Sequence, residues 1–155
     1  MKRITYWPQL FLGITFNIGV LIAYSSITNT IDIEIIFLYL AGIFWTLGYD
    51  TIYAHQDKED DLIVGVKSSA LRLGAYTRPW LVIFYVAAVI LVGLSGWLMH
   101  LSWPFYGALG LGALQAGWQV ATVSINNPDD CLCKFKSNRL FGWLLLAGFI
   151  LGQII

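Results

Sequence analysis

The sequence predicts an all-α protein, a polytopic membrane helix bundle of about five transmembrane helices with its N-terminus in the cytoplasm. Hydrophobic residues make up 58% of the 155 residues and charged residues only 12%, about half the 25% that is usual in soluble domains. Several apolar runs approach or reach the ~20 residues that cross a bilayer as a helix. Since backbone groups in hydrocarbon must bond internally and no alternating barrel pattern occurs, we expect helices throughout a single domain, 1–155.

The expected spans cover residues 10–27, 33–53, 80–99, 105–125 and 140–155. The first run is long and lacks a small-residue cleavage site, so we do not interpret it as a cleavable signal. Two polar stretches, about 54–79 and 126–139, connect spans two and three and spans four and five. Cys131 and Cys133 lie in the second stretch, and a pair of reduced thiols is the simpler interpretation than a metal or redox site.

The basic residues orient the chain. Two precede the first span and the other seven lie in the two polar stretches, while the alternate connections have none. The positive-inside rule therefore places the N-terminus in the cytoplasm and the C-terminus outside. Chemistry on polar groups is expected on the cytoplasmic face, and nothing in the sequence indicates nucleic acid as a partner.

Five of the nine acidic residues fall between positions 50 and 61, directly after the second span. If that span continues as a helix to residue 61, then Asp50, Asp57 and Asp61 fall within about 40° of one another, at about 100° per residue. Asp60 flanks this stripe. Like charges on one helical face repel, and oxygen-only ligands favour Mg²⁺ or Ca²⁺ as the compensating ion. A divalent cation bound along this stripe would offset the repulsion.

Lys67 follows this cluster after Gly65, a residue that can end the helix. A metal-loaded acidic face beside an ammonium group suits a diphosphate. A charge run after a transmembrane helix is, however, more often a solvated loop, and the spacing alone leaves both interpretations open.

The segment LGYDTIYAHQDKEDDLIVGVKSSALRLG, 47–74, closely resembles the second aspartate-rich motif of the UbiA superfamily of membrane prenyltransferases. The segments MKRITYWPQLFLG, RPW and CLCKFKSNRLFGW also resemble this family, so the resemblance covers essentially the whole chain. It implies Mg²⁺-dependent transfer of a polyprenyl group from polyprenyl diphosphate to the ring of 4-hydroxybenzoate, a step in ubiquinone synthesis. The partners that it implies are both substrates and membrane lipid.

The resemblance also implies roles for single residues. Asp57 and Asp61 correspond to the metal ligands of the second motif, with Asp50 and Asp60 in support, and Asp57, Asp61 and Lys67 are the expected catalytic residues. Lys67 is expected to bind diphosphate, with Arg72 as a weaker candidate. Lys2 and Arg3 are candidates for the carboxylate of the aromatic substrate, although membrane-anchoring charges explain them equally well.

One departure from the family pattern matters. The family has nine spans and a first motif, Asn-Asp-x-x-Asp-x-x-x-Asp, which this sequence lacks; Asp32 and Glu34 are expected on the opposite side of the membrane. The chain resembles the C-terminal half only, so we expect activity only as part of a longer or split enzyme with a separate N-terminal half. The alternatives are an inactive remnant, or a non-enzymatic cation-binding membrane carrier or assembly partner. The expected location is a bacterial inner membrane, with the mitochondrial inner membrane as the alternative.

Overall fold

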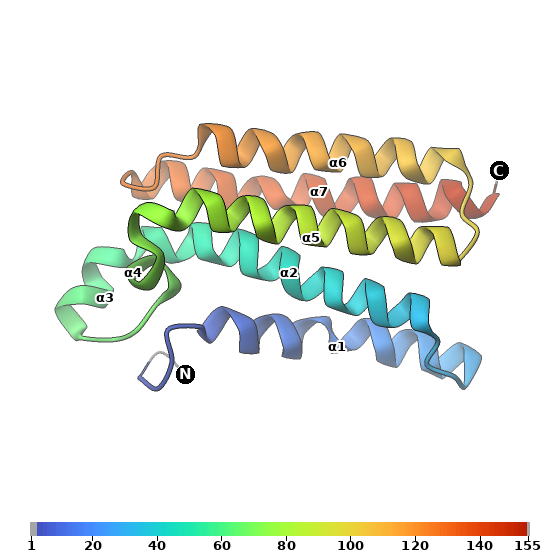
Figure 1. Ribbon diagram of the computed structural model, residues 1–155, viewed down its shortest axis with the longest axis horizontal. Helices are drawn as coiled ribbons and strands as arrows, with labels where there is room; N and C mark the ends of the chain where they lie inside the picture. The colour runs from blue at the N-terminus through green and yellow to red at the C-terminus, as the bar shows by residue number, and fades with distance from the viewer. Residues whose placement is uncertain (1–2, 155) are drawn as a thin grey trace.

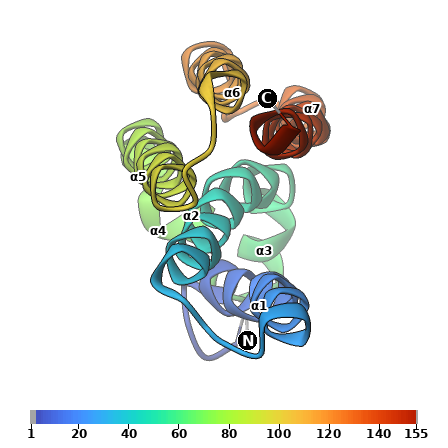
Figure 2. The same ribbon diagram turned by 90° about the vertical axis from the view of Figure 1, so that its right-hand side faces the viewer.

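The computed structural model describes residues 3–154, and every regular element in this range is helical. The elements are α1 (Pro8–Thr28), α2 (Ile33–Gln56), α3 (Lys58–Val64), α4 (Ser69–Leu73), the 3₁₀ turn η1 (Gly74–Tyr76), α5 (Thr77–Leu98), α6 (Trp103–Thr122) and α7 (Pro128–Ile154). The five long helices run side by side along one axis (Figure 1). Figure 2, an end-on view, shows α2 at the centre of the bundle, with α1, α5 and α7 around it and α6 against α5 and α7.

The all-α polytopic prediction is confirmed, and one long helix corresponds to each of the five expected spans, although α5 ends one residue and α6 three residues before the expected ends. Helices α1 and α2 and the segment Ser69–Leu98 are long and apolar enough to cross a membrane by length and composition. The expected polar connection 126–139 is wrong, because α7 begins at Pro128. The Asn127 side-chain oxygen accepts hydrogen bonds from the backbone N–H groups of Asp129 (3.1 Å) and Asp130 (3.2 Å), so a capped helix starts twelve residues earlier than expected.

The two ends of the bundle differ in charge. One end holds the segment before α1, the helices α3 and α4, and the connection from α6 to α7 (Figure 1). We call it the basic end, because all the described Lys and Arg side chains lie in the segment before α1, in the chain from α3 to the first turn of α5, or in the first half of α7. Asp32 and Glu34 lie at the other end of α2, as expected, and Asp32 accepts hydrogen bonds from the hydroxyl groups of Tyr24 (2.7 Å) and Thr30 (2.9 Å).

A buried polar network joins four of the long helices. The side-chain oxygen of Gln119 in α6 accepts hydrogen bonds from the Tyr85 hydroxyl in α5 (2.9 Å) and the Asn138 amide in α7 (3.0 Å). The Asn138 oxygen in turn accepts one from the Trp45 indole in α2 (3.0 Å). Such bonds between apolar helices fix their relative rotation, so the network helps to set which faces of α2 and α7 meet.

Candidate active site

The acidic segment after α2 is not a continuous helix. α2 ends at Gln56, α3 begins at Lys58, and Asp57 lies between them with φ −96° and ψ 8°. The expectation of one unbroken helix to residue 61 is therefore wrong, because the helix is interrupted at one residue, Asp57. The Asp57 carbonyl still accepts a hydrogen bond from the Asp61 N–H (2.8 Å), which keeps the two aspartates one helical turn apart. The acidic first turn of α3 is favourable at a helix N-terminus and favours a restart here.

The four predicted metal ligands have different surroundings. Asp61 is buried, Asp50 and Asp57 are half-buried, and Asp60 is exposed. Asp50 and Asp57 lie seven residues apart, and Ile43 lies seven before Asp50, so the three share one stripe of α2. Ile43 packs against Gly13 of α1, which places the stripe towards α1 and the segment that precedes it.

Asp60 belongs to a different surface. It lines a pocket of about 380 Å³ with His55, Glu59 and the segment around Ile125 and Pro128. This pocket lies between α3 and the α6–α7 connection, whereas the stripe through Asp50 and Asp57 faces α1. The structure thus brings Asp57 and Asp61 together on successive turns and turns Asp60 towards another neighbour.

Within residues 3–154, no three His, Cys, Asp or Glu side chains converge closely enough to enclose a metal ion by themselves. Mg²⁺ does not require such a cage, since it commonly binds one or two carboxylates and completes its shell with water and phosphate oxygens. Two carboxylates one turn apart, with no soft ligand beside them, fit that requirement. They supply only part of the shell of a Mg²⁺ ion.

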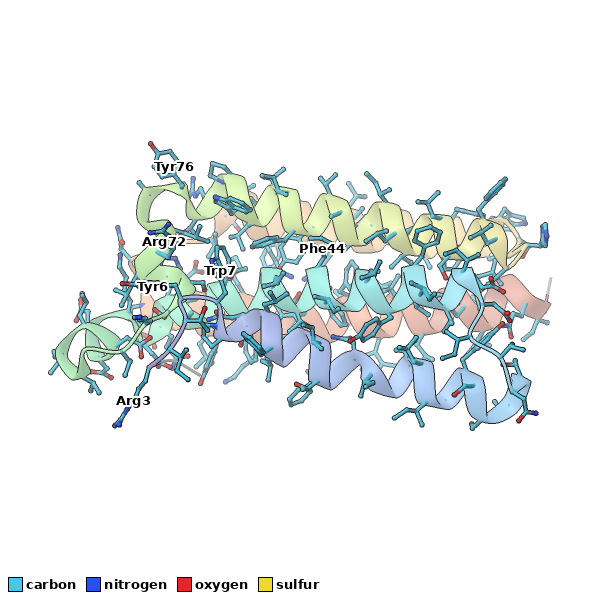
Figure 3. The ribbon with its side chains drawn as sticks, turned by 60° about the horizontal axis from the view of Figure 1, so that its bottom comes forward. Arg3, Tyr6, Trp7, Phe44, Arg72 and Tyr76 are labelled. Atoms are coloured by element: carbon cyan, nitrogen blue, oxygen red, sulfur yellow. The ribbon has the colours of Figure 1, made fainter. Side chains whose placement is uncertain are left out.

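The two cationic candidates meet at one aromatic ring. The Lys67 ammonium donates a hydrogen bond to the Ile4 carbonyl (3.3 Å) and lies 5.4 Å from the centre of the Tyr6 ring. The Arg72 guanidinium lies 5.9 Å from the same ring centre. Tyr6 belongs to the segment before α1, the segment that the acidic stripe faces. Arg3 in this segment is exposed and points away from the helices (Figure 3), and Lys2 lies outside the described residues.

The chain between α3 and α5 is held by local hydrogen bonds. Gly65 ends α3 in the left-handed region (φ 72°), where its N–H bonds to the carbonyls of Asp61 and Leu62. The Ser68 hydroxyl then accepts a hydrogen bond from the Leu71 N–H (3.4 Å) and caps α4, while the hydroxyl groups of Ser69 and Thr51 bond at 3.3 Å. These contacts fasten α4 to α2 and fix the position of Arg72.

Sequence reasoning missed an aromatic wall beside the acidic pair. Trp45, Tyr49 and Tyr53 follow one another at intervals of four along α2, and the α7 residue Phe135 packs against both tyrosines, with ring centres 5.7 and 4.7 Å apart. Trp45 packs against Phe141 at 5.0 Å. Asp57 and Asp61 continue the same interval of four, and this regular spacing is the signal that could have revealed the row.

His55 is buried in the last turn of α2, and its Nε2 lies 2.9 Å from the Thr77 hydroxyl oxygen. The Thr77 hydroxyl donates its own proton to the Gly74 carbonyl (2.8 Å). The histidine therefore joins α2 to the start of α5.

Comparison with known proteins identifies the family. The UbiA prenyltransferase family matches residues 1–151. The chain belongs to this family. As a member of the UbiA prenyltransferase family, it is 47% identical to 4-hydroxybenzoate polyprenyltransferase, mitochondrial, from Arabidopsis thaliana, and 47% identical to the proteins of the same name from Caenorhabditis elegans and Homo sapiens.

Each of these alignments covers 99% of this chain but only 38%, 44% and 42% of the respective relative. This UbiA family chain therefore spans about two-fifths of the length of the curated relatives that it matches. The 4-hydroxybenzoate geranyltransferase 2 of Lithospermum erythrorhizon is 42% identical over 99% of the chain and 51% of its own length. No solved structure gives a significant match.

Proposed function

We propose that this chain supplies the second aspartate motif and the aromatic wall of a membrane-bound aromatic prenyltransferase. The reaction is transfer of a polyprenyl group from polyprenyl diphosphate to the ring of 4-hydroxybenzoate, in ubiquinone synthesis. The observation that carries this proposal is the identity of 47% to relatives named for that activity, over 99% of the chain. The names of these relatives include the word mitochondrial, which supports the mitochondrial alternative for its membrane location.

The site residues have different roles, according to where they lie. Asp57 and Asp61 would hold a Mg²⁺ ion, which would supply positive charge for the departing diphosphate. Lys67 adds a point charge on the leaving group from the segment after α3. Asp50 lies two helical turns before Asp57 on the same stripe and supports the pair. Asp60 acts only at a distance, because it faces another pocket.

The aromatic wall suits the other half of the substrate. When the allylic C–O bond breaks, both electrons leave with the diphosphate and a carbocation remains; the ring carbon ortho to the hydroxyl then attacks it and loses its proton. The ring centre of Phe135 lies within 6 Å of the ring centres of Tyr49 and Tyr53. Aromatic faces stabilise a nearby cation, and apolar walls keep water from it.

The chain spans about two-fifths of its relatives, so we propose that it acts with a segment equivalent to their remaining length, on the same polypeptide or as a separate N-terminal half. The purified chain of 155 residues should bind Mg²⁺ and diphosphate weakly and transfer no prenyl group at a useful rate. Co-expression with the N-terminal half of a close relative should restore transfer. Robust transfer by the 155-residue chain alone would contradict this proposal.

The test uses the restored system with radiolabelled 4-hydroxybenzoate and Mg²⁺. Asp57→Ala and Asp61→Ala should each lower transfer by about 100-fold or more, since each removes transition-state charge stabilisation. Glu59→Ala is the matched control, because Glu59 is exposed beside them and faces the other pocket. Equal losses in all three variants would refute the assignment, and no transfer with any N-terminal half would favour an inactive remnant.

A further inference from the structure

Helices α1 and α5 lie on different sides of α2 (Figure 2). Both helices pack on α2 but hardly touch each other, and they stand apart around α2 in the end-on view (Figure 2). Phe44 and Leu47 of α2 pack in this region with Phe84 of α5. At the basic end, Trp7 bridges the two helices, with its ring centre 6.0 Å from Trp80 and 6.3 Å from Phe84.

A pocket of about 310 Å³ opens at the basic end, lined by Trp7, Arg72, Leu73, Tyr76 and Trp80. Figure 3 shows Arg72 between Tyr76 and Tyr6 at the end of the bundle that holds α4. Arg72 is exposed, and no carboxylate within residues 3–154 forms an ion pair with it. None of the five lining residues is acidic, so the pocket presents a guanidinium above aromatic rings.

The groups around this pocket suit the head group of a phospholipid. Tryptophan residues at the ends of apolar helices mark the membrane interface, and Trp7 and Trp80 lie at such ends. Arg72 lies beside them on α4, in the connection between α3 and α5. A guanidinium fork pairs well with phosphate oxygens, and basic pockets between membrane helices bind anionic lipid head groups.

We propose that this pocket binds the phosphodiester head group of an anionic membrane phospholipid, with Arg72 on the phosphate and Trp7, Tyr76 and Trp80 around the glycerol region. None of the five lining residues belongs to the acidic stripe, although Arg72 shares the Tyr6 ring with Lys67. A pyrophosphate arm in the test therefore separates a lipid site from the proposed diphosphate site.

The test measures lipid retention by native mass spectrometry of the full chain in detergent, with phosphatidylglycerol or phosphatidylcholine of identical acyl chains. The wild-type chain should retain one phosphatidylglycerol at concentrations at which phosphatidylcholine is lost, a comparison that needs no variant. Arg72→Gln should weaken phosphatidylglycerol binding about tenfold, since a hydrogen-bonded charge is removed. Arg72→Lys, which keeps the charge without the fork, should fall between the two.

Arg139→Gln is the matched control, an exposed arginine on α7 that undergoes the same change of charge. Inorganic pyrophosphate is added in a further arm, because the sequence predicted a diphosphate at Arg72. Equal retention of both lipids by the wild type, equal loss in the Arg72→Gln and Arg139→Gln variants, or displacement of the lipid by micromolar pyrophosphate would overturn the proposal. Helical content by circular dichroism accompanies each variant, and the wild-type comparison decides the question if Arg72→Gln misfolds.

Discussion

Replacing Gln119 with methionine tests the buried network that joins α2, α5, α6 and α7. The substitution keeps the length of the side chain but removes the oxygen that accepts from Tyr85 and Asn138. The Asn138 amide retains bonds to the carbonyls of Lys134 (3.2 Å) and Phe135 (3.3 Å). The Tyr85 hydroxyl, in a side chain that is only 4% exposed, loses the partner it has in the native structure.

The expected cost follows from these partners. Interhelical hydrogen bonds in membranes contribute about 0.6 kcal/mol on average, so two of them account for about 1.2 kcal/mol. A buried hydroxyl without a partner costs about 1–3 kcal/mol, while removal of the Gln119 amide nitrogen, which has no partner of its own, offsets part of this. We expect Gln119→Met to lower the free energy of unfolding by about 1–2 kcal/mol.

The assay is unfolding by SDS in mixed micelles, followed by circular dichroism. Tyr85→Phe removes the unpaired hydroxyl, so the double variant Gln119→Met, Tyr85→Phe should be more stable than Gln119→Met alone by about 1 kcal/mol. Gln115→Met is the control and should cost less, since Gln115 is only half-buried and its partner Ser137 keeps a bond to the Lys134 carbonyl. If the double variant is instead less stable than Gln119→Met alone, the network does not act as described.

Two further predictions concern packing and thiol reactivity. Gly48→Ala should destabilise the chain by about 1–3 kcal/mol, because the new methyl group would lie 2.6 Å from the Tyr85 ring, whereas Gly19→Ala has open space and should be neutral or stabilising in the same SDS titration. A maleimide at pH 7.5 should label one thiol per folded chain: Cys133 is exposed, while burial, reinforced by the charge of Asp130, raises the pKa of Cys131 to about 11. Labelling of both cysteines at similar rates before SDS is added would contradict the second expectation.

The long helices could be predicted because a bilayer demands one simple property, an apolar run of sufficient length. The distribution of Lys and Arg likewise predicted which connections share an end. The start of α7 could not be predicted this way, since a charged stretch with two cysteines resembles a loop in the sequence. The Asn127 cap and the Lys134–Asp130 ion pair (3.1 Å), which stabilise the helix start, are seen only in the structure. Local capping outweighed the polar composition there.

The candidate site was only partly predictable for a different reason. Spacing along one helix identified Asp57 and Asp61, because they are local to each other. No glycine or proline beside Asp57 indicates the break between α2 and α3 in the sequence. The partners of His55, Tyr49 and Tyr53 come from α5 and α7, and no pattern within α2 reveals which helix will cover which face.

The row Trp45, Tyr49, Tyr53, Asp57, Asp61 connects these observations. Steps of four residues advance about 40° around a helix, so the row winds slowly from the α7 side of α2 towards the carboxylates while it approaches the basic end. A ligand lying along it would meet aromatic rings first and carboxylates last. Under the proposed function, this order of surfaces would suit a long apolar chain that ends in a diphosphate, with the boundary between rings and carboxylates after Tyr53. The single-residue break at Asp57 falls at this boundary, where the chain changes from a membrane helix to a short helix that carries the charged end of the row.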